Sequence, residues 1–172
     1  FNKKNKWKIA CVYTGKKSQT AGRLIKLKKI LKNEEKFFLT YGDGLSDINI
    51  KALLDFHLNH QKMVTITGVH PPARFGELHE KNGEVISFEE KPQASEGLIN
   101  GGFMIFNRKL LDLLTDEEDC DFEFNALEKL SSQGEVMVYK HKGNWECMDN
   151  ERDVEHLNKV WREGRAFWKV WS

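Results

Sequence analysis

The sequence is poor in cysteine and proline and contains no long hydrophobic run. Three cysteines (Cys11, Cys120 and Cys147) and three prolines occur among 172 residues. Cysteines that are odd in number and far apart match neither a disulfide framework nor a zinc-binding pattern, so we expect reduced thiols in a cytoplasmic protein. No stretch approaches the length of a membrane span, and no apolar run follows the basic start as it would in a secretory signal.

Acidic residues are missing from the first part of the chain. None occurs before Glu34, whereas eleven lysines and arginines do, although the net charge of the whole chain is only +1. Such a basic block is typical of a surface that contacts a polyanion. Because no helix-turn-helix, RNA-binding or zinc-finger pattern accompanies it, we favour a solvated helix and a phosphate-contacting loop over nucleic-acid binding.

The first half of the chain alternates between strand-like and helix-like patterns. Apolar residues at helical spacing predict a helix over residues 21–31 capped by Thr20, and Asp47 is expected to cap a second helix. The strands are predicted over residues 8–13, 37–41 and 63–69. Strand, helix, strand, helix, strand is typical of a parallel sheet with crossover helices.

After residue 70 the pattern is more varied. Asn82-Gly83 predicts a tight hairpin between short strands over 76–80 and 85–89. The remaining predicted elements are strands over 98–106 and 136–139 and helices over 108–114, 122–132 and 152–165. No internal repeat or linker occurs, so residues 1–172 are expected to form a single α/β domain. Its aromatic tail, residues 167–171, is expected to dock on a surface or a partner.

The most informative motif is an aspartate that follows a buried strand and stands between two glycines. Asp43 comes directly after the apolar run 37–41, with Gly42 and Gly44 on either side. In open α/β sheets ligands bind beyond the carboxyl ends of strands, and glycines allow a phosphate to approach the backbone closely. A carboxylate in that place suits Mg²⁺. The alternative is an ordinary turn, since Gly-Asp-Gly is common turn chemistry.

Three further clusters are candidates for chemistry, and each has a simpler alternative. Lys91, fixed in an extended conformation by Pro92, is a point charge for phosphate or else a surface lysine. The glycines after Asn100 indicate close approach by a ligand or crowding within the core. Asp149 precedes the last helix and is either a ligand or a helix N-cap.

The histidines suggest little chemistry of their own. His57 and His60 are one helical turn apart with no third ligand nearby in sequence, so a solvated helix face is favoured over a metal site. His141 is isolated in the sequence. No nucleophile elbow, Rossmann glycine fingerprint or Walker loop is present.

Six short segments occur in one order along the chain and together resemble the glucose-1-phosphate cytidylyltransferases of the sugar-nucleotide pyrophosphorylase family. They are Thr20-Ala21-Gly22-Arg23-Leu24, Phe38-Leu39-Thr40-Tyr41-Gly42-Asp43-Gly44, Pro72-Ala73-Arg74-Phe75-Gly76, Phe88-Glu89-Glu90-Lys91-Pro92, Ile99-Asn100-Gly101-Gly102-Phe103 and Met148-Asp149. One such segment is weak evidence, but six in register are specific. The resemblance runs through essentially the whole chain.

The resemblance implies a Rossmann-like α/β nucleotidyltransferase domain, with a mostly parallel mixed sheet flanked by helices. It implies Mg²⁺-dependent transfer of a cytidylyl group from CTP to α-D-glucose 1-phosphate, giving CDP-glucose and pyrophosphate. CDP-glucose in this family serves dideoxysugar synthesis for lipopolysaccharide O-antigens, and family members form symmetric homo-oligomers. No nucleic-acid or membrane partner is implied.

The resemblance also assigns roles by motif. Asp43 and Asp149 correspond to the carboxylates that hold Mg²⁺, and Lys91 to the lysine on the sugar phosphate. The nucleotide contacts are expected at Ser18, Thr20, Arg23 and Gly42. The sugar pocket is expected to include Gly76, Glu90, Asn100 and Gly101.

One departure from the family pattern concerns the glycine-rich nucleotide loop. Family members begin with a segment in which Gly-Gly-x-Gly-Thr-Arg is followed by a Lys-Pro pair, and this sequence lacks that segment. We therefore expect the chain to represent roughly the C-terminal two-thirds of the family domain and to lack its N-terminal nucleotide-binding segment. Two other hypotheses stay open: an inactive segment that retains a sugar-phosphate half-site or an oligomer interface, and a metal-dependent glycosyltransferase.

Overall fold

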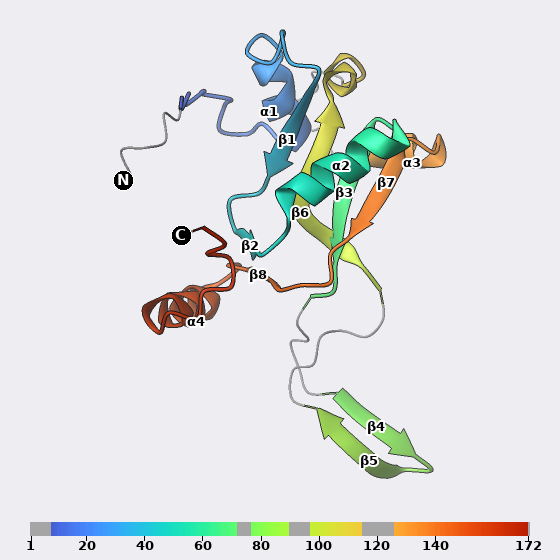
Figure 1. Cartoon of the computed structure of the whole chain (residues 1–172), viewed down its shortest axis with the longest axis vertical. Coiled ribbons are helices and arrows are strands. Elements are labelled where there is room, and N and C mark those ends of the chain that lie inside the picture. Colours follow the sequence, from blue (N-terminus) through green and yellow to red (C-terminus); the bar gives the residue numbers. More distant parts are fainter. Residues whose placement is uncertain (1–7, 72–76, 90–96, 115–125, 172) are drawn as a thin grey trace.

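The computed structural model describes residues 8–71, 77–89, 97–114 and 126–171 (Figure 1). Its helices are α1 (Thr20–Leu27), α2 (Ile50–His60), α3 (Glu128–Ser132) and α4 (Glu151–Arg162), with a 3₁₀ helix over Arg108–Asp112. Its strands are β1 (Lys36–Thr40), β2 (Gly44–Ser46), β3 (Val64–Val69), β4 (Glu77–Lys81), β5 (Glu84–Glu89), β6 (Ile99–Asn107), β7 (Val136–Lys140) and β8 (Trp145–Cys147).

The central sheet has four strands in the order β1-β6-β3-β7. β6 pairs antiparallel with both β1 and β3, whereas β3 and β7 are parallel. β1, β3 and β7 therefore run in one direction, and β6 alone runs against them. The expected α/β class with a mixed sheet is confirmed. The simple parallel crossover from β1 to β3 is wrong, because β6, which comes later in the chain, lies between them.

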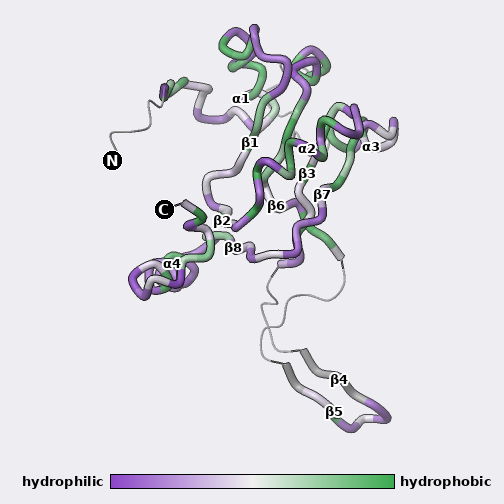
Figure 2. Tube along the Cα trace, viewed as in Figure 1, coloured by the Kyte–Doolittle hydropathy of each residue, from purple (hydrophilic) through white to green (hydrophobic). Residues whose placement is uncertain are grey.

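Helices cover both faces of this sheet, as the alternation along β6 requires. Met104 and Phe106 point into a large cluster with α1, the 3₁₀ helix and α3. Ile105, between them in sequence, packs on the other face against Leu53 of α2. Figure 2 shows the corresponding concentration of hydrophobic residues along β1 and β6. This two-sided burial fixes the positions of the central strands.

The first predicted strand does not form. Residues 8–15 have no regular structure, and Ile9 and Tyr13 are 77% and 82% exposed. A short apolar segment is stable as a strand only when a neighbour accepts its backbone hydrogen bonds, and among the described strands none pairs with these residues.

Both expected helix caps are wrong. Gln19 occupies the N-cap position of α1 and Thr20 is its first helical residue; the helix ends at Leu27, before the predicted end. α2 is capped by Asn49, whose side chain accepts a hydrogen bond from the amide of Ala52, so Asp47 is not the cap. The segment 108–114 forms a short 3₁₀ helix in place of an α-helix.

The pair His57 and His60 does not lie on a solvated face. His57 is 2% exposed, and Thr65 Oγ1 lies 2.8 Å from His57 Nδ1 and 2.6 Å from His60 Nε2. The amide of Lys62 donates to His60 Nδ1, so His60 carries its proton on Nε2 and donates it to Thr65. The helix turns these rings inward because β3 offers a hydroxyl at Thr65.

Two small antiparallel pairs complete the fold. β4 and β5 form the predicted hairpin, with positive φ at Asn82 and Gly83, and Figure 1 shows it standing apart from the main sheet. β2 pairs with β8 beyond the end of β1. After α4, the tail folds back so that Trp168 stacks on Trp161. Among the described residues, no helix is long and apolar enough to cross a bilayer.

Candidate active site

The carboxyl ends of β1, β3 and β7 meet at one edge of the sheet, and Asp43 lies there. The amide of Tyr41 donates to the carbonyl of Gly102, which continues the pairing of β1 with β6 for one residue. The chain then leaves the sheet, and Asp43 is exposed. A Cβ at Gly42 would meet no atom within 4 Å, so open space borders the backbone at this point. The position matches that of ligand sites in open α/β sheets.

Asp149 approaches Asp43 through the ladder between β2 and β8. Gly44 is opposite Cys147 in this antiparallel pair, and the amide of Met148 donates to the carbonyl of Asp43 at 3.0 Å. Asp149 follows Met148 directly. Two acids that are more than a hundred residues apart in sequence are thus brought to adjoining positions of one short ladder.

The thiol of Cys147 lies next to Asp149, and its pKa is raised by the surrounding acidic residues. Its Sγ donates to Asp149 Oδ2 at 3.4 Å. Burial, this hydrogen bond, and the negative charges of Asp149, Asp153 and Asp43 together raise the pKa of Cys147 to about 11. Asp43 and Asp149 are thus both among the charges that disfavour the thiolate of Cys147.

The cap of α4 is Asn150 and not Asp149. The Asn150 side chain accepts from the amide of Asp153, and Asp153 Oδ2 accepts from the amides of Asn150 and Asp149 at 3.3 and 3.1 Å. This capping box holds the backbone of Asp149 just before the helix. The simpler alternative for Asp149, an N-cap role, is therefore excluded.

A hollow of about 510 Å³ lies between α1 and the end of β1. Its lining includes four residues that the sequence singled out, Thr20, Arg23, Gly42 and Asp43. Arg23 Nη1 donates to Thr14 Oγ1 at 2.7 Å, which turns the guanidinium toward the loop before α1. One wall of the hollow is thus cationic and the other ends in a carboxylate.

Ser18 lies near this hollow but is not part of its lining. Its hydroxyl donates to the carbonyl of Thr14 and accepts from Lys26 Nζ at 3.0 Å. Lys26 also donates to the carbonyl of Thr14 at 2.9 Å. Through these contacts the buried Ser18 side chain joins the two ends of the loop over residues 14–18.

The glycines after Asn100 are explained by crowding. A Cβ at Gly101 would lie 2.7 Å from Val69 Cγ1, and Gly102 has a φ of +76° with Tyr41 Cδ2 in the path of a Cβ. Asn100 Oδ1 accepts from the amide of Gly102 at 3.0 Å, which stabilises this bend. Packing within the sheet therefore accounts for both glycines.

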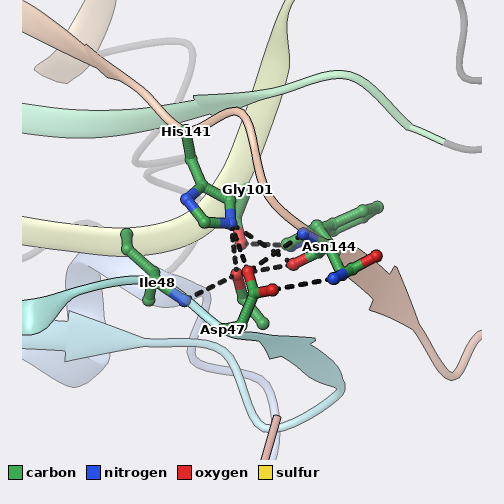
Figure 3. Close-up of polar contacts among 7 residues, drawn as sticks. Asp47, Ile48, Gly101, His141 and Asn144 are labelled. Carbon is green, nitrogen blue, oxygen red and sulfur yellow. Dashed lines mark hydrogen bonds and ion pairs between the residues drawn. The ribbon is translucent and has the colours of Figure 1, made fainter. Parts of the chain in front are cut away.

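A polar network at the same edge was missed from the sequence (Figure 3). Asp47 Oδ1 accepts from His141 Nε2 and from the amide of Asn144, both at 2.9 Å, and Oδ2 accepts from Asn144 Nδ2 at 2.7 Å. Trp145 Nε1 donates to the carbonyl of Gly101 at 2.8 Å. Nothing local in the sequence connects Asp47 with residues near 141, so no signal for this network was available.

Comparison with known proteins identifies the family. Residues 1–163 match the family described as Nucleotidyl transferase. The chain belongs to the nucleotidyl transferase family. It is 43% identical over 166 residues to the glucose-1-phosphate cytidylyltransferase of Salmonella typhimurium, covering 96% of this chain and 64% of that protein. It is 38% identical over 165 residues to the probable glucose-1-phosphate cytidylyltransferase of Bacillus subtilis, with the same coverage.

The chain therefore spans about 64% of the length of these relatives. A crystal structure of a putative glucose-1-phosphate thymidylyltransferase from Bacillus anthracis, in complex with a sucrose, superposes with a TM-score of 0.63. That match has 14% identity and covers 87% of this chain and 63% of the other. At that identity the likeness shows a shared fold.

Within this nucleotidyl transferase domain, several expected site residues lie outside the described ranges. These are Gly76, Glu90 and Lys91. Among the described residues, no group of three or more His, Cys, Asp or Glu side chains is arranged to hold a metal ion. The carboxylates beside the β2–β8 ladder are a pair, which is the number that Mg²⁺ usually takes from a protein when phosphate oxygens complete its shell.

Proposed function

We propose that this chain is part of a glucose-1-phosphate cytidylyltransferase. The reaction is the Mg²⁺-dependent transfer of a cytidylyl group from CTP to α-D-glucose 1-phosphate, which yields CDP-glucose and pyrophosphate. The observation that carries the proposal is the hydrogen bond from Met148 to Asp43, because it brings Asp43 and Asp149 together beyond the end of β1. The relatives at 43% and 38% identity support the choice of substrates.

The chemistry of the donors fits a hard divalent cation. Asp43 and Asp149 are both exposed, and their oxygens are the ligand type that Mg²⁺ prefers. The nearby Cys147 thiol, with a pKa of about 11, is protonated at neutral pH and does not offer a soft thiolate. Mg²⁺ held by these carboxylates supplies neutralisation of the charge that develops on the α-phosphate.

The protein's own groups then have to position two polyanions. Arg23, at the wall of the hollow, donates to CTP phosphate oxygens, and Thr20 and Gly42 let the nucleotide approach the backbone. Ser18 acts on nucleotide binding indirectly, because its hydrogen bonds hold the loop before α1 in place. Positioning and charge neutralisation are the main catalytic needs of phosphoryl chemistry.

The sugar phosphate is assigned to Lys91, whose ammonium holds the nucleophilic phosphate. Glu90 accepts from sugar hydroxyls, and Gly76 and Asn100 line the sugar pocket together with the backbone of Gly101, whose lack of a side chain is already required by packing against Val69. The attacking phosphate is already ionised near neutral pH, so the transfer requires no general base from the protein. We assign the product to dideoxysugar synthesis for lipopolysaccharide O-antigens, in a cytoplasmic homo-oligomer.

The test combines turnover with binding. The chain is incubated with CTP, glucose 1-phosphate and MgCl₂, and pyrophosphate is measured with a coupled pyrophosphatase assay, while calorimetry measures binding of glucose 1-phosphate. Pyrophosphate that depends on all three components supports the proposal. Binding without turnover supports the alternative of an inactive segment with a sugar-phosphate half-site. Transfer from a supplied nucleotide sugar, with no pyrophosphate from CTP, would identify a glycosyltransferase.

A further inference from the structure

The β2–β8 ladder carries the site but is intrinsically weak. It contains only three paired residues on each strand. A two-stranded ladder this short is marginal by itself, and its register is poorly specified by backbone bonds alone. A slip of β8 along β2 would move Asp149 away from Asp43, so something else has to fix the register.

Asp47 supplies specific contacts at the far end of this ladder (Figure 3). Ser46 pairs with Trp145, and Asp47 lies opposite Asn144 at the next position, with its amide 3.4 Å from the Asn144 carbonyl. The Asp47 carboxylate accepts from both the backbone and the side-chain amide of Asn144. This two-pronged recognition depends on one residue type at one position.

Neighbouring registers do not reproduce these bonds. A slip of two residues keeps every side chain on its own face and would place either Lys142 or Glu146 opposite Asp47. Glu146 would repel the Asp47 carboxylate; Lys142 could form only an exposed ion pair with it, which is weak, and the two bonds from Asn144 to the carboxylate would be lost. The observed register is therefore selected against both alternatives.

The loop that leads into β8 packs closely against the Asp47 carboxylate. A Cβ at Gly143 would collide with Asp47 Oδ1 and with the His141 ring. The amide of His141 donates to the carbonyl of Gly68 at 2.9 Å, which ties this loop to β3. With the Asp47 side chain 24% and the His141 side chain 10% exposed, the bond between them is partly shielded from water, whereas Asn144 is exposed.

We infer that Asp47 is a positioning residue that fixes the register of β8 against β2 and thereby sets Asp149 beside Asp43. It touches neither ligand of the proposed cation and acts through Asn144. The metal half of the inference rests on the proposed function, whereas the register half stands on the contacts described above.

The test compares Asp47→Ala with the exchange variant Asp47→Asn/Asn144→Asp, which restores an amide–carboxylate pair with the groups reversed. Thr65→Ala is the stability control, because it removes hydrogen bonds near the other end of β3. Hydrogen exchange of the Met148 amide reports the register, and Mn²⁺ line broadening around Asp43 and Asp149 reports the metal site.

We expect Asp47→Ala to speed exchange at Met148 by roughly tenfold or more and to weaken Mn²⁺ broadening by a similar factor, with both restored in the exchange variant. Thr65→Ala should change neither beyond its effect on global unfolding. Unchanged Met148 exchange in Asp47→Ala would overturn the inference. Faster exchange together with no Mn²⁺ effect in the wild-type chain would support the register role and count against the proposed function alone.

Discussion

The amide of Met148 donates a hydrogen bond to the carbonyl of Asp43, 3.0 Å away. This bond joins the chain that leaves β1 to the chain that leaves β8, and Asp149 is the next residue after Met148. The pairing brings the backbones of Asp43 and Asp149 to one edge of the sheet, where Asp43 lines a hollow that has Arg23 in its wall. The proposed chemistry follows from that juxtaposition.

The Cys147 thiol provides a test of the charges around it. A pKa of about 11, in place of an ordinary 9.0, leaves roughly a hundredfold less thiolate at pH 8. We expect iodoacetamide to label exposed Cys11 readily and Cys147 very slowly, as measured by peptide mass spectrometry. Asp149→Asn removes a negative charge beside the sulfur and should accelerate labelling of Cys147. Equal labelling in Asp149→Asn and wild type would show that Asp149 does not act on the thiol.

We expect the free energy of unfolding to fall in mild acid, because His57 is buried and His60 is partly buried. Burial is the largest cause that lowers the pKa of His57 and of His60 below 6.5. The charge of Lys36 lowers the pKa of His57 further, and the charge of Lys62 does the same for His60, where Glu135 acts in the opposite direction. The unfolded chain therefore binds more protons than the native chain once the pH falls below 6.5. The stabilisation is complete above about pH 6.5 and is lost as the pH falls through the native pKa values.

Urea denaturation at pH 7.5 and pH 5.5 measures this loss. The wild-type chain should have a lower urea midpoint at pH 5.5, and His57→Gln should reduce the difference between the two midpoints. A pH-independent midpoint would contradict the account of these rings.

Alanine substitutions at Gly101 and Gly42 distinguish a glycine that is required by packing from one that leaves room for a ligand. Gly101→Ala places a Cβ against Val69 Cγ1 and should lower the free energy of unfolding by about 1–3 kcal/mol. Gly42→Ala meets no atom within 4 Å and should leave stability unchanged, while it weakens CTP binding because Gly42 lines the hollow. Chemical denaturation and calorimetry with CTP make the comparison. Equal stability of the two variants would contradict the packing assigned to Gly101.

Local chemistry made part of the fold predictable. The hairpin at Asn82-Gly83 forms because both residues adopt positive φ, which these residue types favour, and the strand before Asp43 forms as its apolar run indicates. The insertion of β6 between β1 and β3 depends on contacts between distant segments. Periodicity along one segment carries no information about such pairing.

The candidate site residues could be proposed from sequence motifs, but the way the fold brings some of them together could not be predicted. Asp43 and Asp149 were selected by motif, but the ladder that brings them together and the contact of Asp47 with His141, 94 residues away, arise only in three dimensions. Asp47 was expected to cap a helix, because an aspartate before an apolar stripe is typical of a cap. Asn49, two residues later, takes that place and leaves Asp47 to bind Asn144.

Paramagnetic NMR with Mn²⁺ tests the central claim most directly. In the wild-type chain, the amide signals of Gly42, Gly44, Met148 and Asn150 should broaden together at low Mn²⁺ concentration. Asp43→Asn and Asp149→Asn should each abolish this broadening, because one ion requires both carboxylates, and the corresponding variants should lose Mg²⁺-dependent CDP-glucose formation wherever the wild type shows it. Broadening that persists in both variants, or that never centres on these residues, would contradict the account.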